Sequence, residues 1–164
     1  GLTGIREIVR DVSGLGDVLR RVTVRWPDGG ITTSLDDLAR ELSAEPQVLA
    51  IVHRRRDARE LAEQLPSLGR SHLSTRMCAA HRSRVLASIR EALDAGAPCR
   101  VVSTQLGEAG VDVDFPVVFR ALAGLDSLAQ AAGRCNRNGT LVDSAGRPAL
   151  GRFVVFRADT PAPA

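Results

Sequence analysis

The chain is organised around one stretch, which begins Cys99-Arg-Val-Val-Ser-Thr-Gln-Leu-Gly-Glu-Ala-Gly-Val-Asp-Val-Asp-Phe115 and ends Gln130-Ala-Ala-Gly-Arg-Cys-Asn-Arg-Asn-Gly139. Its apolar start, residues 99–102, predicts a buried strand. Small and polar residues follow, from Ser103 to Gln105. Backbone amides and hydroxyls in such a turn are suited to hold a phosphate, so this point is a candidate anion site.

The far end of the stretch carries two arginines, Arg134 and Arg137. On a helix, residues three apart share a face, and we therefore expect both side chains to converge on one anion. Arginine suits this work because its planar guanidinium can bond two oxygens at once.

Predicted strands and helices alternate along the rest of the chain. Apolar runs and alternation predict strands at 21–26, 48–52, 72–74, 99–102, 116–121 and 152–156. Spacing and capping signals predict helices at 34–42, 57–65, 78–95 and 127–135, with Ser34 and Asp126 as caps of the first and last. We therefore expect an α/β fold, a three-layer domain with a mostly parallel central sheet and helices on both faces.

The beginning of the chain is harder to interpret. Residues 1–20 suggest an extension or linker with a short helix that Gly14-Leu-Gly16 breaks. The turn 27–30 predicts a return strand at 31–33, which would form a two-stranded ribbon appended to the sheet or a linker from a preceding lobe. The expected domain spans 21–158, followed by a frayed Pro/Ala-rich tail at 159–164.

The organising stretch resembles motifs V and VI of superfamily 2 helicases. The T…G-x-D core of motif V fits Thr104, Gly110 and Asp112, and the Q-x-x-G-R-x-x-R core of motif VI fits Gln130, Gly133, Arg134 and Arg137. The particular residues of both motifs, together with the segment 72–82, are most similar to the CRISPR-associated helicase–nuclease of type I interference systems. The resemblance extends from about Trp26 to Phe156.

This resemblance implies a RecA-like (P-loop NTPase-like) second helicase lobe that closes over ATP bound to a first lobe. In the motif VI segment it implies that Arg137 is an arginine finger, that Arg134 assists it, and that Gln130 positions phosphates or water. It places Gly110 and Gly133 with Asp112 in the nucleotide site. There Asp112 is expected to bond either the ribose or a motif VI arginine.

Candidate nucleic-acid contacts follow three of the predicted strands. Arg54, Arg55 and Arg56 come after the strand 48–52, where either a phosphate contact or a solvated charge run fits the pattern. By the resemblance, the segment with Ser74, Thr75 and Arg76 lies along a bound single strand, and Thr104 couples that strand to motif V. Hydroxyls and guanidinium groups suit phosphate contacts that ignore base sequence.

The sequence lacks several groups that the complete helicase needs. It contains no lysine and no Asp-Glu dipeptide, so neither a P-loop nor the magnesium-holding acidic box is present. We therefore expect ATP and Mg²⁺ to be held mainly by a first lobe, and the isolated chain to be inactive. The expected partners are that lobe, single-stranded DNA and a CRISPR surveillance complex.

Composition and cysteine spacing narrow the classes of function that remain open. The net charge is +3, which permits a polyanionic partner without requiring one. Three scattered cysteines indicate neither a disulfide framework nor a zinc ribbon, and His72, Cys78 and His81 do not match a known metal spacing, so we expect no metal site. No apolar run is long enough to span a bilayer, and we expect a cytoplasmic protein. Two alternatives remain: a lobe of another superfamily 2 DNA or RNA translocase, and a non-catalytic RecA-like docking module.

Overall fold

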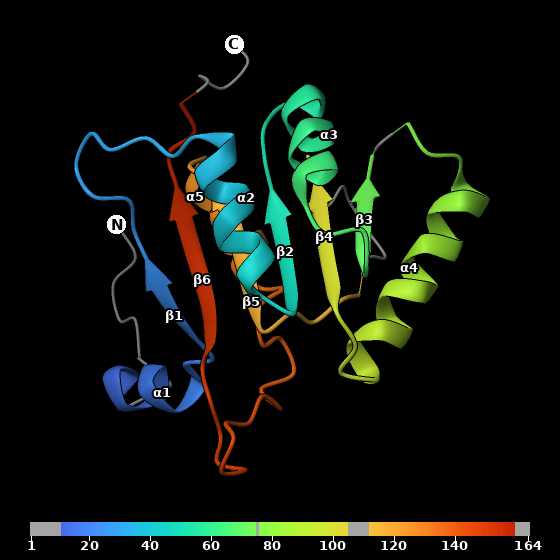
Figure 1. The fold of residues 1–164 in the computed structure, drawn as a ribbon. Coiled ribbons are helices and arrows are strands. Elements are labelled where there is room, and N and C mark those ends of the chain that lie inside the picture. The colour runs from blue at the N-terminus through green and yellow to red at the C-terminus, as the bar shows by residue number, and fades with distance from the viewer. Residues whose placement is uncertain (1–10, 75, 105–111, 160–164) are drawn as a thin grey trace, which may run out of the picture.

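The structure is a computed structural model that describes residues 11–74, 76–104 and 112–159. Thr75, Glu108 and Gly110 therefore lie outside the described residues. Figure 1 shows a twisted sheet between helices. The strands are β1 (Val22–Arg25), β2 (Gln47–Ile51), β3 (Arg70–Leu73), β4 (Cys99–Ser103), β5 (Val117–Ala121) and β6 (Gly151–Phe156). The helices are α1 (Val12–Leu19), α2 (Leu35–Ala44), α3 (Arg55–Gln64), α4 (Ala79–Asp94) and α5 (Leu125–Ala132).

The six strands lie in the order β1-β6-β5-β2-β4-β3, and every pairing in this sheet is parallel. The central strands are buried on both faces because alternate residues enter two separate cores. From β2, Val48 and Ala50 pack with α2 and α3, whereas Leu49 and Ile51 pack with α4 and α5. The predicted three-layer α/β architecture is confirmed.

The structure corrects the ribbon predicted near the beginning of the chain. β1 is the edge strand of the main sheet and pairs in parallel with β6, with Val22 opposite Gly151. The residues 31–33 form no return strand, and Thr33 makes only an isolated parallel bridge to Ala158. The prediction failed because a turn signal says where a chain reverses, while the partner of the strand before it depends on tertiary contacts.

Helix boundaries depend on the caps. Ser34 caps α2 as predicted, since its hydroxyl accepts a hydrogen bond from the Asp37 N–H at 3.1 Å. α1 runs through Gly14 and Gly16, where a helix break was predicted, and most of the short helix predicted before them lies outside the described residues. α5 begins after Gly124, so Asp126 lies in its first turn and does not cap it. Among the described residues, no helix combines the length and apolar character needed to cross a membrane.

Candidate functional site

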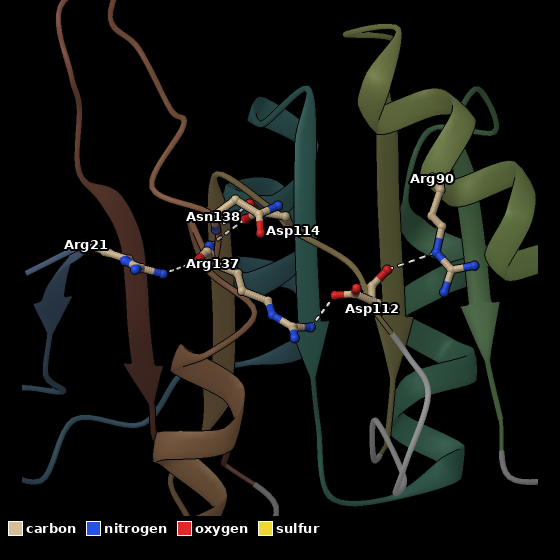
Figure 2. A network of polar contacts seen from close by, with 6 residues as sticks. All are labelled: Arg21, Arg90, Asp112, Asp114, Arg137 and Asn138. Carbon is tan, nitrogen blue, oxygen red and sulfur yellow. Dashed lines mark hydrogen bonds and ion pairs between the residues drawn. The ribbon is translucent and has the colours of Figure 1, made fainter. Parts of the chain in front are cut away.

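Arg137 and Asp112 meet on the face of the sheet that carries α4 and α5. The Arg137 guanidinium forms an ion pair with the Asp112 carboxylate, and Figure 2 shows the two side chains meeting between these helices. Both side chains are accessible, with 42% of Arg137 and 72% of Asp112 exposed. The structure therefore brings together one arginine of the second motif and the aspartate of the first.

The ion pair is possible because two chain segments lie side by side before β5. Phe115 is buried, and its N–H donates to the Arg134 carbonyl at 2.9 Å. In return, the Phe115 carbonyl accepts from the Asn136 N–H at 2.9 Å, so Phe115 and Cys135 form a parallel bridge. This pairing ties the segment that enters β5 to the segment that leaves α5.

The main chain of Arg137 is bonded on both sides. Its N–H donates to Asp114 Oδ1 at 2.7 Å, and the next N–H, of Asn138, donates to Asp114 Oδ2 at 3.0 Å. The Arg137 carbonyl accepts a hydrogen bond from the Arg21 guanidinium. Figure 2 shows Arg21, Asp114 and Asn138 around the main chain of Arg137, while its guanidinium extends away from them toward Asp112.

Asn136 anchors this turn from within. It is 4% exposed and has a positive φ of 45°, a backbone region that asparagine tolerates better than most residues. Its side-chain amide donates to the carbonyls of Arg21 and Ala149, both at 3.0 Å, and its side-chain oxygen accepts from the Leu141 N–H at 3.1 Å. One buried side chain thus joins the turn to the starts of β1 and β6.

The other predicted motif VI residues lie around the end of α5. Gln130 is exposed on α5, Gly133 ends the helix, and Arg134 is half-buried just beyond it. The prediction that one helical face carries both arginines is wrong, because the helix stops at Ala132. What sets the direction of Arg137 is the turn at Asn136 and its bonds to Asp114.

The candidate strand contacts form a separate group. Arg54 to Arg56 follow β2, Ser74 and Arg76 follow β3, and Thr104 follows β4. Since β2, β4 and β3 are neighbours in a parallel sheet, these residues lie along one edge, at the carboxyl ends of the strands. Arg55 and Arg56 are exposed in the first turn of α3, and Arg76 is exposed before α4.

Helix α4 touches the motif V segment. It begins just after the strand-contact residues, and its Arg90 donates from Nε to the main-chain oxygen of Asp112 at 2.9 Å. Figure 2 shows Asp112 between Arg90 and Arg137, with its carbonyl toward one and its carboxylate toward the other. Asp112 is therefore bonded both to α4, through Arg90, and to the motif VI turn, through Arg137.

Two basic groups, the half-buried His53 and the buried Arg120, lie near the carboxyl ends of β2 and β5. The His53 ring bonds the Leu122 carbonyl through Nε2 at 3.0 Å, and burial lowers its pKa. Arg120 is 7% exposed within β5, and burial lowers its pKa as well; its NH1 group lies 3.5 Å from the Ile51 carbonyl oxygen. No three potential metal-ligating side chains gather among the residues that the structure describes.

Sequence reasoning missed the groups that orient Arg137: Arg21, Arg90, Asp114 and Asn136. Only Asp114 carried a signal, because its spacing from Asp112 in an extended segment puts both carboxylates on one side. Arg21 bonds Asn136 and Arg137 from 115 and 116 positions away, and no local pattern encodes these two contacts.

Comparisons with known proteins agree with this architecture. The family described as CRISPR-associated nuclease/helicase Cas3, C-terminal, matches residues 44–140, which is more than half of the chain. A CRISPR-associated nuclease/helicase Cas3 from Haloferax volcanii is 50% identical over 56 residues, or 34% of this chain and 6% of that protein.

Solved structures share the fold. The crystal structure of T. fusca Cas3-ATP matches with a TM-score of 0.63 and 22% identity, over 86% of this chain and 18% of that one. The C-terminal domain of the DEAD-box protein Dbp5 matches with a TM-score of 0.61 and 16% identity, over 85% of this chain and 78% of that one. The predicted RecA-like fold class is thus confirmed, although the chain spans only a small part of its Cas3 relatives. On the family match, this chain belongs to the CRISPR-associated nuclease/helicase Cas3 family and corresponds to its C-terminal helicase region.

Proposed function

We propose that this chain is the second lobe of an ATP-dependent DNA helicase or translocase of CRISPR interference. In this role it supplies an arginine finger and contacts to single-stranded DNA. The observation that carries the proposal is the meeting of Arg137 with Asp112, an accessible guanidinium held by the aspartate of a separate motif.

The geometry suits a guanidinium that must exchange partners. An exposed ion pair stabilises a protein by only about 0–1 kcal/mol, so little is lost when Arg137 leaves Asp112. The planar guanidinium can bond two oxygens of a phosphate in the same way that it bonds a carboxylate. Near a phosphoryl group in transfer, the guanidinium would neutralise the negative charge that develops there.

The remaining parts of the nucleotide site belong elsewhere in the protein. The chain has no lysine, so the lysine that grips the β- and γ-phosphates comes from a first RecA-like lobe. That lobe also holds Mg²⁺. Arg134, Gln130 and Gly133 border the ATP from this side, together with Gly110, which comes two positions before Asp112 in the sequence. The matching family is described as CRISPR-associated, which supports a CRISPR surveillance complex as the loading partner of the complete protein.

Single-stranded DNA binds along the carboxyl ends of β2, β4 and β3. The groups there are guanidiniums and hydroxyls, which contact phosphates without reading bases. Arg54, Arg55 and Arg56 contribute from the start of α3, Ser74, Thr75 and Arg76 from the segment after β3, and Thr104 from the end of β4. Opening and closing of the two lobes around ATP then moves the strand.

Replacement of Arg137 in the complete two-lobe protein tests this function. Arg137→Lys keeps the charge but loses the planar fork, and we expect ATP turnover to fall about a thousandfold with little change in ATP affinity. The control is Arg152→Lys on β6, which keeps a cation beside Glu45 and should leave turnover within a few-fold. Wild-type turnover by the Arg137→Lys protein would refute the arginine finger.

A further inference from the structure

The segment that enters β5 presents two carboxylates to Arg137. Residues 112–115 alternate in exposure: Val113 and Phe115 are 4% and 1% exposed and pack into the core under α4 and α5, whereas Asp112 and Asp114 face outward. Because Phe115 is bonded to the chain on both sides of Cys135, the register of the two segments is fixed. Both carboxylates therefore lie against the turn that carries Arg137.

The two aspartates do different work. Asp112 pairs with the guanidinium of Arg137, at the end of a long side chain. Asp114 bonds the backbone: each of its oxygens accepts one N–H, from Arg137 at 2.7 Å and from Asn138 at 3.0 Å. Hydrogen bonds from amides to an ionised carboxylate are stronger than those between neutral groups. Asp114 thereby fixes the point from which the Arg137 side chain extends.

On its solvent-facing side, the turn is held by these hydrogen bonds to Asp114. Asn136 holds it from the core, but Arg137 itself is exposed and lies beyond the end of α5. Two successive N–H groups turned toward one side form a small concavity that favours an anion. Here the anion is a side chain of the same chain, Asp114, so the concavity is already occupied when a nucleotide arrives.

We propose that Asp114 is a positioning residue for Arg137, and that the Asp112-x-Asp114 pair acts as one device. Asp112 holds the side chain until phosphate replaces it, and Asp114 keeps the backbone in place throughout that exchange. Only side-chain torsions of Arg137 then change, which keeps the reorganisation required at the moment of reaction small. The inference rests on the proposed arginine finger.

A double-mutant cycle in the complete two-lobe protein tests the inference. Asp114→Ala removes both hydrogen bonds and is expected to lower kcat about a hundredfold, the effect of displacing a catalytic group by about 1 Å, with a much smaller change in the KM for ATP. Asp114→Asn keeps one acceptor oxygen and should fall between Asp114→Ala and the unchanged protein. In an Arg137→Lys background, Asp114→Ala should cost only a few-fold more, because the residue through which it acts is already altered.

Each arm has a distinct result. Asp94→Asn, an exposed aspartate at the end of α4, is the matched control and should leave kcat unchanged. An equal loss of kcat from Asp114→Ala in both backgrounds, or a loss confined to KM, would overturn the positioning role. If Asp114→Ala does not fold, the same comparison is made with the nearly isosteric Asp114→Asn. If Arg137 is not an arginine finger, a separate result shows it: the Arg137→Lys single variant keeps full ATP turnover.

Discussion

Arg137 and Asp112 are 25 positions apart in sequence and form an ion pair in which both side chains remain exposed to solvent. The pair lies between α4 and α5, with Arg90 bonded to the main chain of the same aspartate. Because the ion pair is exposed, its effect on the direction of the Arg137 side chain differs from its effect on the stability of the fold. It orients the guanidinium of the proposed arginine finger, and it contributes little to the stability of the fold.

Asp112→Ala should therefore have little effect on folding. We expect the free energy of unfolding of this chain to change by no more than about 1 kcal/mol, since the lost ion pair is solvated. The hydrogen bond from Arg90 goes to the main-chain oxygen and survives the substitution. Urea unfolding followed by circular dichroism measures the difference. A loss several times larger would mean that the pair is a structural element of the lobe.

Asn136→Ala should be far more disruptive. It strips partners from two carbonyls and one N–H near the turn, and it places alanine at a φ of 45°. Unsatisfied buried groups cost about 1–3 kcal/mol each, but these three hydrogen bonds are only partly buried and water replaces some of the lost partners, so we expect a loss of roughly 2–4 kcal/mol in the same urea experiment.

Two further substitutions separate the causes of that loss. Asn136→Gly relieves the backbone strain but restores no hydrogen bond, and it should recover only part of the stability. Asn136→Asp retains an acceptor for Leu141 but cannot donate to the two carbonyls, so it should remain strongly destabilised. Full stability in Asn136→Asp would show that the donated bonds contribute nothing.

The sequence predicted the elements that local patterns encode. The apolar runs correctly located the buried strands β2, β4, β5 and β6, because a strand covered on both faces has few polar positions. Ser34 correctly located the start of α2, because a cap acts within one helical turn. The two helicase motifs correctly indicated the fold class and the family, since each is a cluster of unusual residues at fixed spacing.

Contacts between distant segments could not be predicted in this way. The pairing of β1 with β6 joins residues more than a hundred positions apart, and nothing in residues 22–25 specifies their partner. The end of α5 was placed too late because Gly133 to Cys135 are compatible with a helix. Tertiary bonds from Phe115 instead hold them in the turn that points Arg137 toward Asp112.

The isolated chain should not hydrolyse ATP. It contains no lysine for the phosphates and no acidic box for Mg²⁺, so the proposed arginine finger alone has no bound nucleotide to act on. Phosphate release assays with and without single-stranded DNA, beside a buffer blank, measure this. Turnover that copurifies with the chain through two different columns would contradict the assignment of these groups to another lobe.

Thiol reactivity should report how well the core protects its two buried cysteines, one of which, Cys135, lies beside the Arg137 turn. Cys78 is exposed, whereas Cys99 and Cys135 are buried. Burial raises the pKa of Cys99 to about 11 and that of Cys135 to about 12, so both remain protonated and unreactive near pH 8. One thiol should react rapidly with a chromogenic disulfide reagent in the native chain, and three should react in denaturant. Cys78→Ser should abolish the fast phase; a fast thiol that remains in that variant would mean that the core around Cys99 or Cys135 opens readily.

Single-stranded DNA should bind this chain weakly, without base preference and with strong dependence on salt. The candidate contacts at the carboxyl ends of β2, β4 and β3 are phosphate-binding groups, and each contact with a single strand adds about 0.7 to the slope of log affinity against log salt. Arg76→Gln should reduce that slope by about this amount, measured by fluorescence anisotropy with labelled oligothymidylate at several salt concentrations. Arg147→Gln is the matched control, because Arg147 is also exposed but precedes β6 and so lies at the opposite ends of the strands. If the two variants change the slope equally, binding reflects net charge alone; if neither changes it, the strand lies elsewhere on the lobe.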